Sequence, residues 1–217
     1  MYPVPVLVEP ELVRCEGDWI VNVPQGKVAE ALSLARSENL KGFKLNSFTG
    51  ATQETLDALL SAVDPGILVI AGQIEVRRLA PSLSRLVLGI GTPWPASLVR
   101  SNVRDFSCME SVAVELLPPR VERLEMFGFA SKNLSPFREL PLLAELRLAE
   151  AKWLESLNGV PAGLAQLHIV ACKKLFDISA LQNSGIRSFS IELCPKVPKE
   201  EIKKMRALLD GLDVDAQ

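Results

Sequence analysis

The spacing of apolar residues in the C-terminal third of the chain limits the possible folds more than any other feature. An apolar residue is followed by a second one three positions later and by a third one two positions after that. This triplet occurs three times, at Leu143, Leu146 and Leu148, at Leu164, Leu167 and Ile169, and at Ile186, Phe189 and Ile191. The units begin 21 and then 22 residues apart. Because side chains alternate between the faces of a strand, this spacing predicts one short strand in each unit.

The same spacing continues upstream with less regularity. Earlier units begin, in chain order, at Asp18, Leu40, Pro65, Leu83, Val103 and Val121. The first of these is a weak match and the third is a loose one. A slip of one residue would turn every side chain of a strand to the other face, so a shared register over so many units is hard to obtain by chance. We therefore expect stacked units throughout residues 18–197.

The unit also has a ninth position, which is occupied by Ala151, Cys172 and Cys194 in the three regular copies. The full pattern, L-x-x-L-x-L-x-x-C/A, resembles that of the leucine-rich repeat family. Phe48 and Phe129 fill the ninth position of earlier units, and no asparagine occurs there, which departs from the family pattern. Proline shortly before the strand, as in residues 81–83 and 119–121, is similar to the bacterial members.

The resemblance implies an α/β leucine-rich repeat solenoid. Such a fold carries a parallel β-sheet on its concave face and short helices and turns on its convex face, and the concave face is normally a docking surface. Helical periodicity at residues 27–36 and 52–63 supplies candidates for the convex side, with Thr52 as a helix N-cap.

The ends of a solenoid must be covered, because a terminal repeat exposes an apolar layer. Residues 199–210 place one apolar stripe on a helix that ends at Gly211, with the members Ile202, Met205, Leu208 and Leu209. We predict an N-terminal cap at residues 1–17, the solenoid at 18–197, and a C-terminal capping helix and tail at 198–217. The alternative for this helix is binding to a membrane or a partner, which its mixed acidic and basic polar face disfavours.

Composition excludes several classes of partner. Lys and Arg number 24 against 26 Asp and Glu, so the chain lacks the positive field that drives binding to nucleic acid. The longest apolar run, Ile67–Ala71, is far shorter than a membrane-spanning helix. The N-terminal residues have no basic leader and contain prolines, which break a signal helix. We expect a cytoplasmic protein that binds neither nucleic acid nor membrane, and the oligomeric state stays open.

The cysteines do not form a disulfide or metal framework in the sequence. Cys108 falls at a core position, and Cys172 and Cys194 share one column of adjacent units, where a bridge is geometrically conceivable. A cytoplasmic location favours free thiols, and whether these two are bridged stays open. Since the sequence has neither a CxxC motif nor a Cys/His cluster, we expect no metal, and it likewise suggests no cofactor.

The third, fifth and seventh positions of each unit point away from the core. At the third position, Arg85, Asp105, Arg123 and Glu145 alternate in charge. Neighbouring strands lie about 4.8 Å apart, so these side chains are expected to pair as a surface ladder.

Apolar side chains also gather at these outward positions, which is typical of a docking site. The alternative is that the irregular middle, or the segment 92–95, folds over them. We predict contacts to a protein partner, anchored by Met109 and Phe127, from a set of apolar, charged and histidine side chains: Val69, Val87, Ile90, Met109, Glu125, Phe127, Arg147, His168 and Val170.

A catalytic alternative depends on His168, the only histidine, with Ser190 as its neighbour on the next strand. Arg147 lies on the other side of His168, where a triad needs a carboxylate. Nucleophile-elbow and phosphate-loop motifs are missing from the sequence. We therefore predict no enzymatic activity and assign no catalytic residues.

The sequence as a whole favours a non-catalytic protein-binding module that docks a protein partner on its concave strand face. By analogy with small bacterial proteins of this repeat family, the partner is a toxin and the chain is an immunity protein. The alternatives are a substrate-recognition or scaffold subunit of a larger assembly, and a hydrolase that uses Ser190 and His168.

Overall fold

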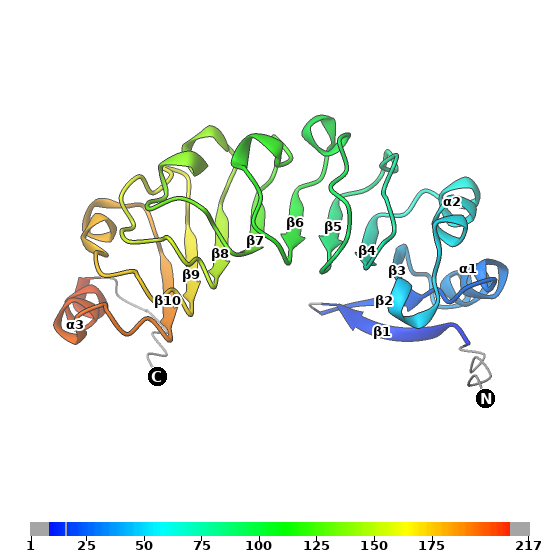
Figure 1. Ribbon diagram of the computed structural model, residues 1–217, viewed down its shortest axis with the longest axis horizontal. Helices are drawn as coiled ribbons and strands as arrows, with labels where there is room; N and C mark the ends of the chain where they lie inside the picture. Colours follow the sequence, from blue (N-terminus) through cyan, green and yellow to red (C-terminus); the bar gives the residue numbers. More distant parts are fainter. Residues whose placement is uncertain (1–8, 16, 209–217) are drawn as a thin grey trace. The chain divides into compact units, whose positions relative to one another are not determined.

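The computed structural model describes residues 9–15 and 17–208, and the chain divides into two compact units, residues 1–97 and 98–217. Both units are built from short strands with helices between or after them (Figure 1). The repeat pattern predicted one array over residues 18–197, whereas contacts divide that range after Ser97.

Unit 1 contains five described strands that pair in chain order. Its elements are β1 (Glu11–Cys15), β2 (Asp18–Asn22), α1 (Val28–Ser37), β3 (Gly42–Asn46), η1 (Ser47–Thr49, a 3-10 helix), α2 (Gln53–Ala62), β4 (Ile67–Ala71) and β5 (Arg85–Leu88). β1 runs antiparallel to β2, and all the other pairs in this unit are parallel.

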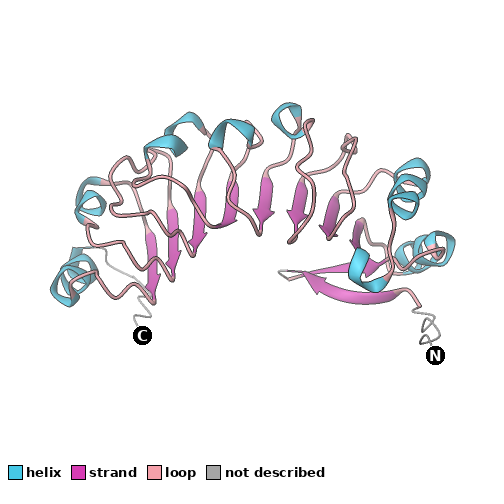
Figure 2. Cartoon of the chain, in the orientation of Figure 1, coloured by secondary structure: helices cyan, strands magenta, loops and turns pink. Residues whose placement is uncertain are grey.

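Unit 2 contains five further described strands, all paired in parallel in chain order. Its elements are η2 (Leu98–Arg100), β6 (Asp105–Cys108), η3 (Val114–Leu116), β7 (Arg123–Phe127), η4 (Ser135–Glu139), β8 (Glu145–Ala149), β9 (Gln166–Val170), η5 (Ser179–Asn183), β10 (Ser188–Glu192) and α3 (Lys199–Leu208). The 3-10 helices of this unit lie on one side of its strands (Figure 2).

The core follows the predicted register. At the fourth position, Leu124, Leu146, Leu167 and Phe189 are register partners on successive strands, and all are buried. The sixth position gives a second buried row, Met126, Leu148, Ile169 and Ile191. These rows lie on the face that the helical turns cover, so apolar burial fixes which side of each strand faces inward.

The predicted helices form close to their expected bounds. Thr52 caps α2 as expected, and a capping box joins it to Thr55 in both directions. Met205 of α3 is buried and this helix packs against η5, as a lid on the last strands would, while Leu208 is exposed. Leu209 and Gly211 lie outside the described residues. No helix in the described part of the chain has the length and apolar character needed to cross a membrane.

Phe48, at the ninth position of its unit, and Asp18, at a predicted core position, are both exposed. Phe48 is 78% exposed, because the chain turns into η1 directly after β3, where the Asn46 side chain accepts a hydrogen bond from the Phe48 backbone. Asp18, the first position of the weakest unit, is also exposed. By contrast, Phe129 is buried and stacks on Phe137 at a centroid distance of 4.6 Å.

The β1–β2 hairpin of unit 1 covers part of the strand face that the sequence predicted to be open. Only Val21 and Asn22 of β2 pair with β3. The preceding Ile20 is fully buried and its side chain lies against Gly42, an outward position of β3. The prediction placed β1 in an N-terminal cap that ends at residue 17 and β2 in the solenoid, whereas the two strands pair as one hairpin.

An ion pair joins this hairpin to a distant strand of the same unit. The Asp18 carboxylate lies 3.0 Å from the Arg85 guanidinium, although β3 and β4 lie between β2 and β5 in the strand order. Arg85 is 5% exposed, so the prediction that it lies on an open surface is wrong. An N-terminal segment, the β1–β2 hairpin, therefore contacts the outward positions Gly42 and Arg85.

Gly42 tests this packing. A Cβ at Gly42 would overlap the Ile20 Cγ2 atom and lie 3.3 Å from the Ile67 Cβ. We expect Gly42→Ala to lower the free energy of unfolding by about 1–3 kcal/mol, because the hairpin must shift. Urea unfolding measures this value.

Gly66→Ala is the matched control, because its nearest neighbour would be the Lys41 Cβ at 3.8 Å. Ile20→Ala removes the overlapping methyl group and should therefore cost less in the Gly42→Ala background than in the wild type. Equal costs in the two backgrounds, or equal effects of the two glycine substitutions, would contradict the covering role of the hairpin.

Candidate functional site

The candidate site is the outer strand face of unit 2, which we define as the side of β6–β10 that bears the third, fifth and seventh positions. Its three rows run across the strands, because parallel pairing places equivalent positions side by side. The residues between them point into the core, so the same alternation that builds the core presents this face.

The third-position row is a ladder of ion pairs. Arg123 lies between two carboxylates, with its Nε 2.8 Å from Glu145 and an Nη atom 3.1 Å from Asp105. The hydrogen bond to Glu145 is the main cause of a raised pKa for Arg123. This part of the predicted ladder is confirmed. Since Arg123 is half exposed, each pair contributes at most about 1 kcal/mol, and the main effect is to orient the side chains.

The fifth-position row is polar and also connected. Ser107 donates a hydrogen bond to Glu125 at 3.4 Å, and the Arg147 Nε lies 3.2 Å from the other Glu125 oxygen. Farther along the same row, His168 Nδ1 and Ser190 Oγ are 2.7 Å apart. The Glu125 and Arg147 charges thus largely balance each other.

The seventh-position row is apolar over four neighbouring strands. Phe127, Ala149 and Val170 are register partners on β7, β8 and β9. Cys108 of β6 is the register partner of Met126 of β7, and Met109 directly follows Cys108. Met109 is 38% exposed, Phe127 and Val170 are half-buried, and Ala149 is 5% exposed. We name Met109, Phe127, Ala149 and Val170 the apolar row. At about 4.8 Å per strand, its length is about 14 Å.

The remaining predicted contacts lie in unit 1 and differ from one another. Val69 is only 9% exposed and offers little surface to a partner. Val87 is half-buried, and Ile90, in the turn after β5, is 67% exposed. The predicted set therefore falls into two groups, one in each unit, and the structure brings Met109, Glu125, Phe127, Arg147, His168 and Val170 together on the outer strand face of unit 2.

His168 and Ser190 are close enough for a hydrogen bond but lie in an open, polar row. His168 is the register partner of Arg147 on one side and of Ser190 on the other. A cation thus stands beside the imidazole where a catalytic triad has a carboxylate. This arrangement fits a polar contact better than an activated nucleophile.

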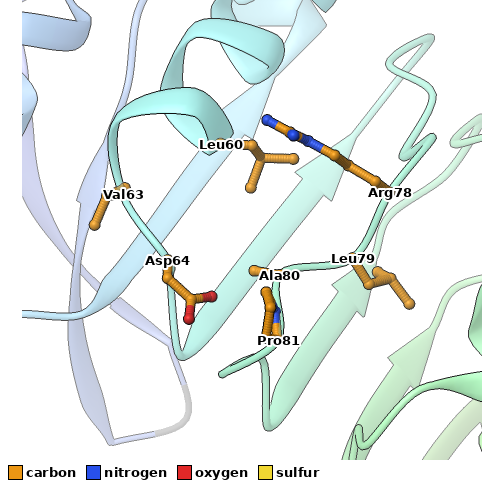
Figure 3. Close-up of a pocket in the computed structure, with 7 residues that line it drawn as sticks. All are labelled: Leu60, Val63, Asp64, Arg78, Leu79, Ala80 and Pro81. Carbon is orange, nitrogen blue, oxygen red and sulfur yellow. The ribbon is translucent and has the colours of Figure 1, made fainter.

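Within residues 9–15 and 17–208, no group of three or more His, Cys, Asp or Glu side chains is placed to hold a metal ion. A shallow pocket of about 100 Å³ lies in unit 1 between the end of α2 and the segment before β5 (Figure 3). The charged side chains that line the pocket already form hydrogen bonds. The Asp64 carboxylate accepts one from the Ser82 backbone N–H, and the Arg78 guanidinium donates one to the Ser61 hydroxyl.

Sequence reasoning missed two features near the site. It did not include Ala149 among the predicted partner contacts, although Ala149 occupies the seventh position of its unit. It also missed the contact between Lys174 and Trp153, in which the ammonium lies 3.9 Å from the ring centroid of a half-exposed indole. Trp153 and Lys174 occupy equivalent positions in adjacent units, and this spacing could have predicted their contact.

Comparison with models of known protein families and with curated proteins finds no match to this chain.

The catalytic alternative has a direct test. We expect a fluorophosphonate probe to leave Ser190 unmodified, because Arg147 lies beside His168 at the place where a triad has the carboxylate that orients its histidine. Mass spectrometry of the labelled protein measures the modification. Labelling of Ser190 that disappears in His168→Ala would contradict this expectation and support a hydrolase.

Proposed function

We propose that this chain is a non-catalytic protein-binding module of the leucine-rich repeat type, and that it docks a protein partner on the outer strand face of unit 2. The observation that carries the proposal is the apolar row beside two rows of paired charges. An exposed apolar strip with a polar border is the usual composition of a protein interface.

The arrangement of the row favours binding of an ordered surface. Phe127 has a large side chain on β7, and a strand backbone holds it in place without the entropy cost of ordering a loop; Met109 directly follows the last residue of β6. The paired charges at Arg123 and Arg147 are likewise positioned before a partner arrives. They would select the orientation of the partner more than they would add affinity.

The finer version of the proposal is that the chain is a cytoplasmic immunity protein and that its partner is a toxin, which the face would occlude. Support for this version comes from the bacterial style of the repeats and the small size of the chain. A substrate-recognition or scaffold subunit would use the same face, and the identity of the captured protein distinguishes the two.

The proposal is tested with a photo-crosslinking amino acid at Met109 in cells that produce the protein. We expect one protein to be crosslinked in high yield and identified by mass spectrometry. Phe127→Asp in the same background should reduce that crosslink at least about tenfold, because a charge replaces the apolar anchor. Its melting temperature should stay close to that of the wild type, since Phe127 is not in the core.

Leu116→Asp is the control, because Leu116 is an apolar residue of η3 that is 44% exposed, and the 3-10 helices of this unit lie on the other side of the strands (Figure 2). It should leave the crosslink intact. Loss of the crosslink in both variants, or in neither, would contradict docking on this face. Unfolding of Phe127→Asp would instead place Phe127 in the core and contradict the outward assignment.

A further inference from the structure

Two thiols lie side by side at the end of the last strand pair. Val170 of β9 and Glu192 of β10 are register partners, and Cys172 and Cys194 each follow two residues later. The Cys172 sulfur is 3.5 Å from the Val170 carbonyl oxygen, and the Cys194 sulfur is 3.2 Å from that of Glu192. The two side chains thus take the same orientation on adjacent units.

The two sulfurs also interact directly. Each of the two side chains shifts the pKa of the other, and both cysteines are free thiols in this structure. Positions on neighbouring parallel strands are separated by about the distance that a disulfide spans between its Cα atoms. A bond between them therefore requires little movement of the backbone.

The surroundings give the two thiols different roles. Cys172 is fully buried, whereas Cys194 is partly exposed. The neighbouring Cys172 side chain lowers the pKa of Cys194, whereas the Cys194 side chain, together with burial, raises the pKa of Cys172. Cys194 is thus the thiol that solvent reaches and that more readily forms a thiolate, which is the reactive form.

We propose that Cys172 and Cys194 form an oxidisable dithiol that reacts with peroxides to give an intrachain disulfide between the last two strands. This proposal is independent of the protein-binding function above.

The chemistry proceeds in two balanced steps. The Cys194 thiolate attacks one oxygen of the peroxide, the O–O bond breaks, and the products are a sulfenic acid and hydroxide or alkoxide. The Cys172 thiol then attacks the Cys194 sulfur, which forms the S–S bond and releases water, with the thiol proton leaving on the hydroxyl group. The peroxide is reduced by two electrons and the dithiol is oxidised by two.

The disulfide would tie β9 to β10 and to the C-terminal helix that follows. It closes a loop between two adjacent repeats, which removes conformational freedom from the unfolded chain. We expect the melting temperature of the oxidised protein to rise by several degrees, about 5 °C or more, relative to the reduced protein.

The test treats the reduced full chain with one equivalent of hydrogen peroxide. Two of the four thiols should disappear in a thiol titration, and the intact mass should fall by two hydrogen atoms. After trypsin digestion without reductant, the peptides 153–173 and 188–196 should be found as one crosslinked species. Dithiothreitol should restore both thiols.

Single variants assign the roles. Cys194→Ser should lose the disulfide, and Cys172→Ala should stop at a sulfenic acid on Cys194 that dimedone traps. Cys15→Ser is the matched control and should still form the bond. Cys108 should keep its thiol throughout, because burial raises its pKa to about 12.

The opposite results are equally clear. Unchanged thiols in the wild type, a sulfinic acid on Cys194 without a disulfide, or a bond that involves Cys15 would each overturn the proposal. Because Cys194 is partly exposed, Cys194→Ser should fold. This variant therefore tests the proposal even if Cys172→Ala fails to fold.

Discussion

The alternation of side chains along parallel strands in a shared register is the constraint on which the rest of the structure depends. In unit 2, one set of alternate positions forms continuous buried rows, and the other set forms the outer strand face. A register shift of one residue would bury Arg123 and expose Leu124. The cost of unpaired buried charge and exposed leucine therefore fixes the core and the candidate binding face together.

The two units use the same alternation differently. In unit 1 the β1–β2 hairpin places Ile20 on Gly42 and pairs Asp18 with Arg85, so outward positions become buried. In unit 2, Met109 and Phe127 keep exposed surface beside charges that are already paired. The part of the candidate site best suited to a partner is accordingly the strand face of unit 2.

The parallel strands from β2 to β10 and the buried rows were predictable from sequence, because a repeated spacing reports local periodicity, whereas β1 and its antiparallel pairing with β2 were not. The ladder from Asp105 through Arg123 to Glu145 was predictable for the same reason. The burial of Arg85 could not be predicted in this way, since its partner Asp18 is 67 residues away and belongs to a segment outside the regular repeat. The exposure of Phe48 depends on a local turn that Asn46 stabilises, which the repeat spacing does not encode. The thiol pair was visible in the sequence as a shared column, but the difference in burial between Cys172 and Cys194 required coordinates.

Hydroxyl-radical footprinting of the native protein tests the two-faced strand most directly, because unit 2 offers residues of the same type on opposite faces. Met109 and Phe127 should be oxidised readily, whereas Met126 and Phe106, which are fully buried, should be protected. Met126 and Phe127 are neighbours in β7, so their contrast isolates the alternation from chain position. Similar oxidation of Met109 and Met126, or protection of Phe127 equal to that of Phe106, would contradict the assignment of an open binding face.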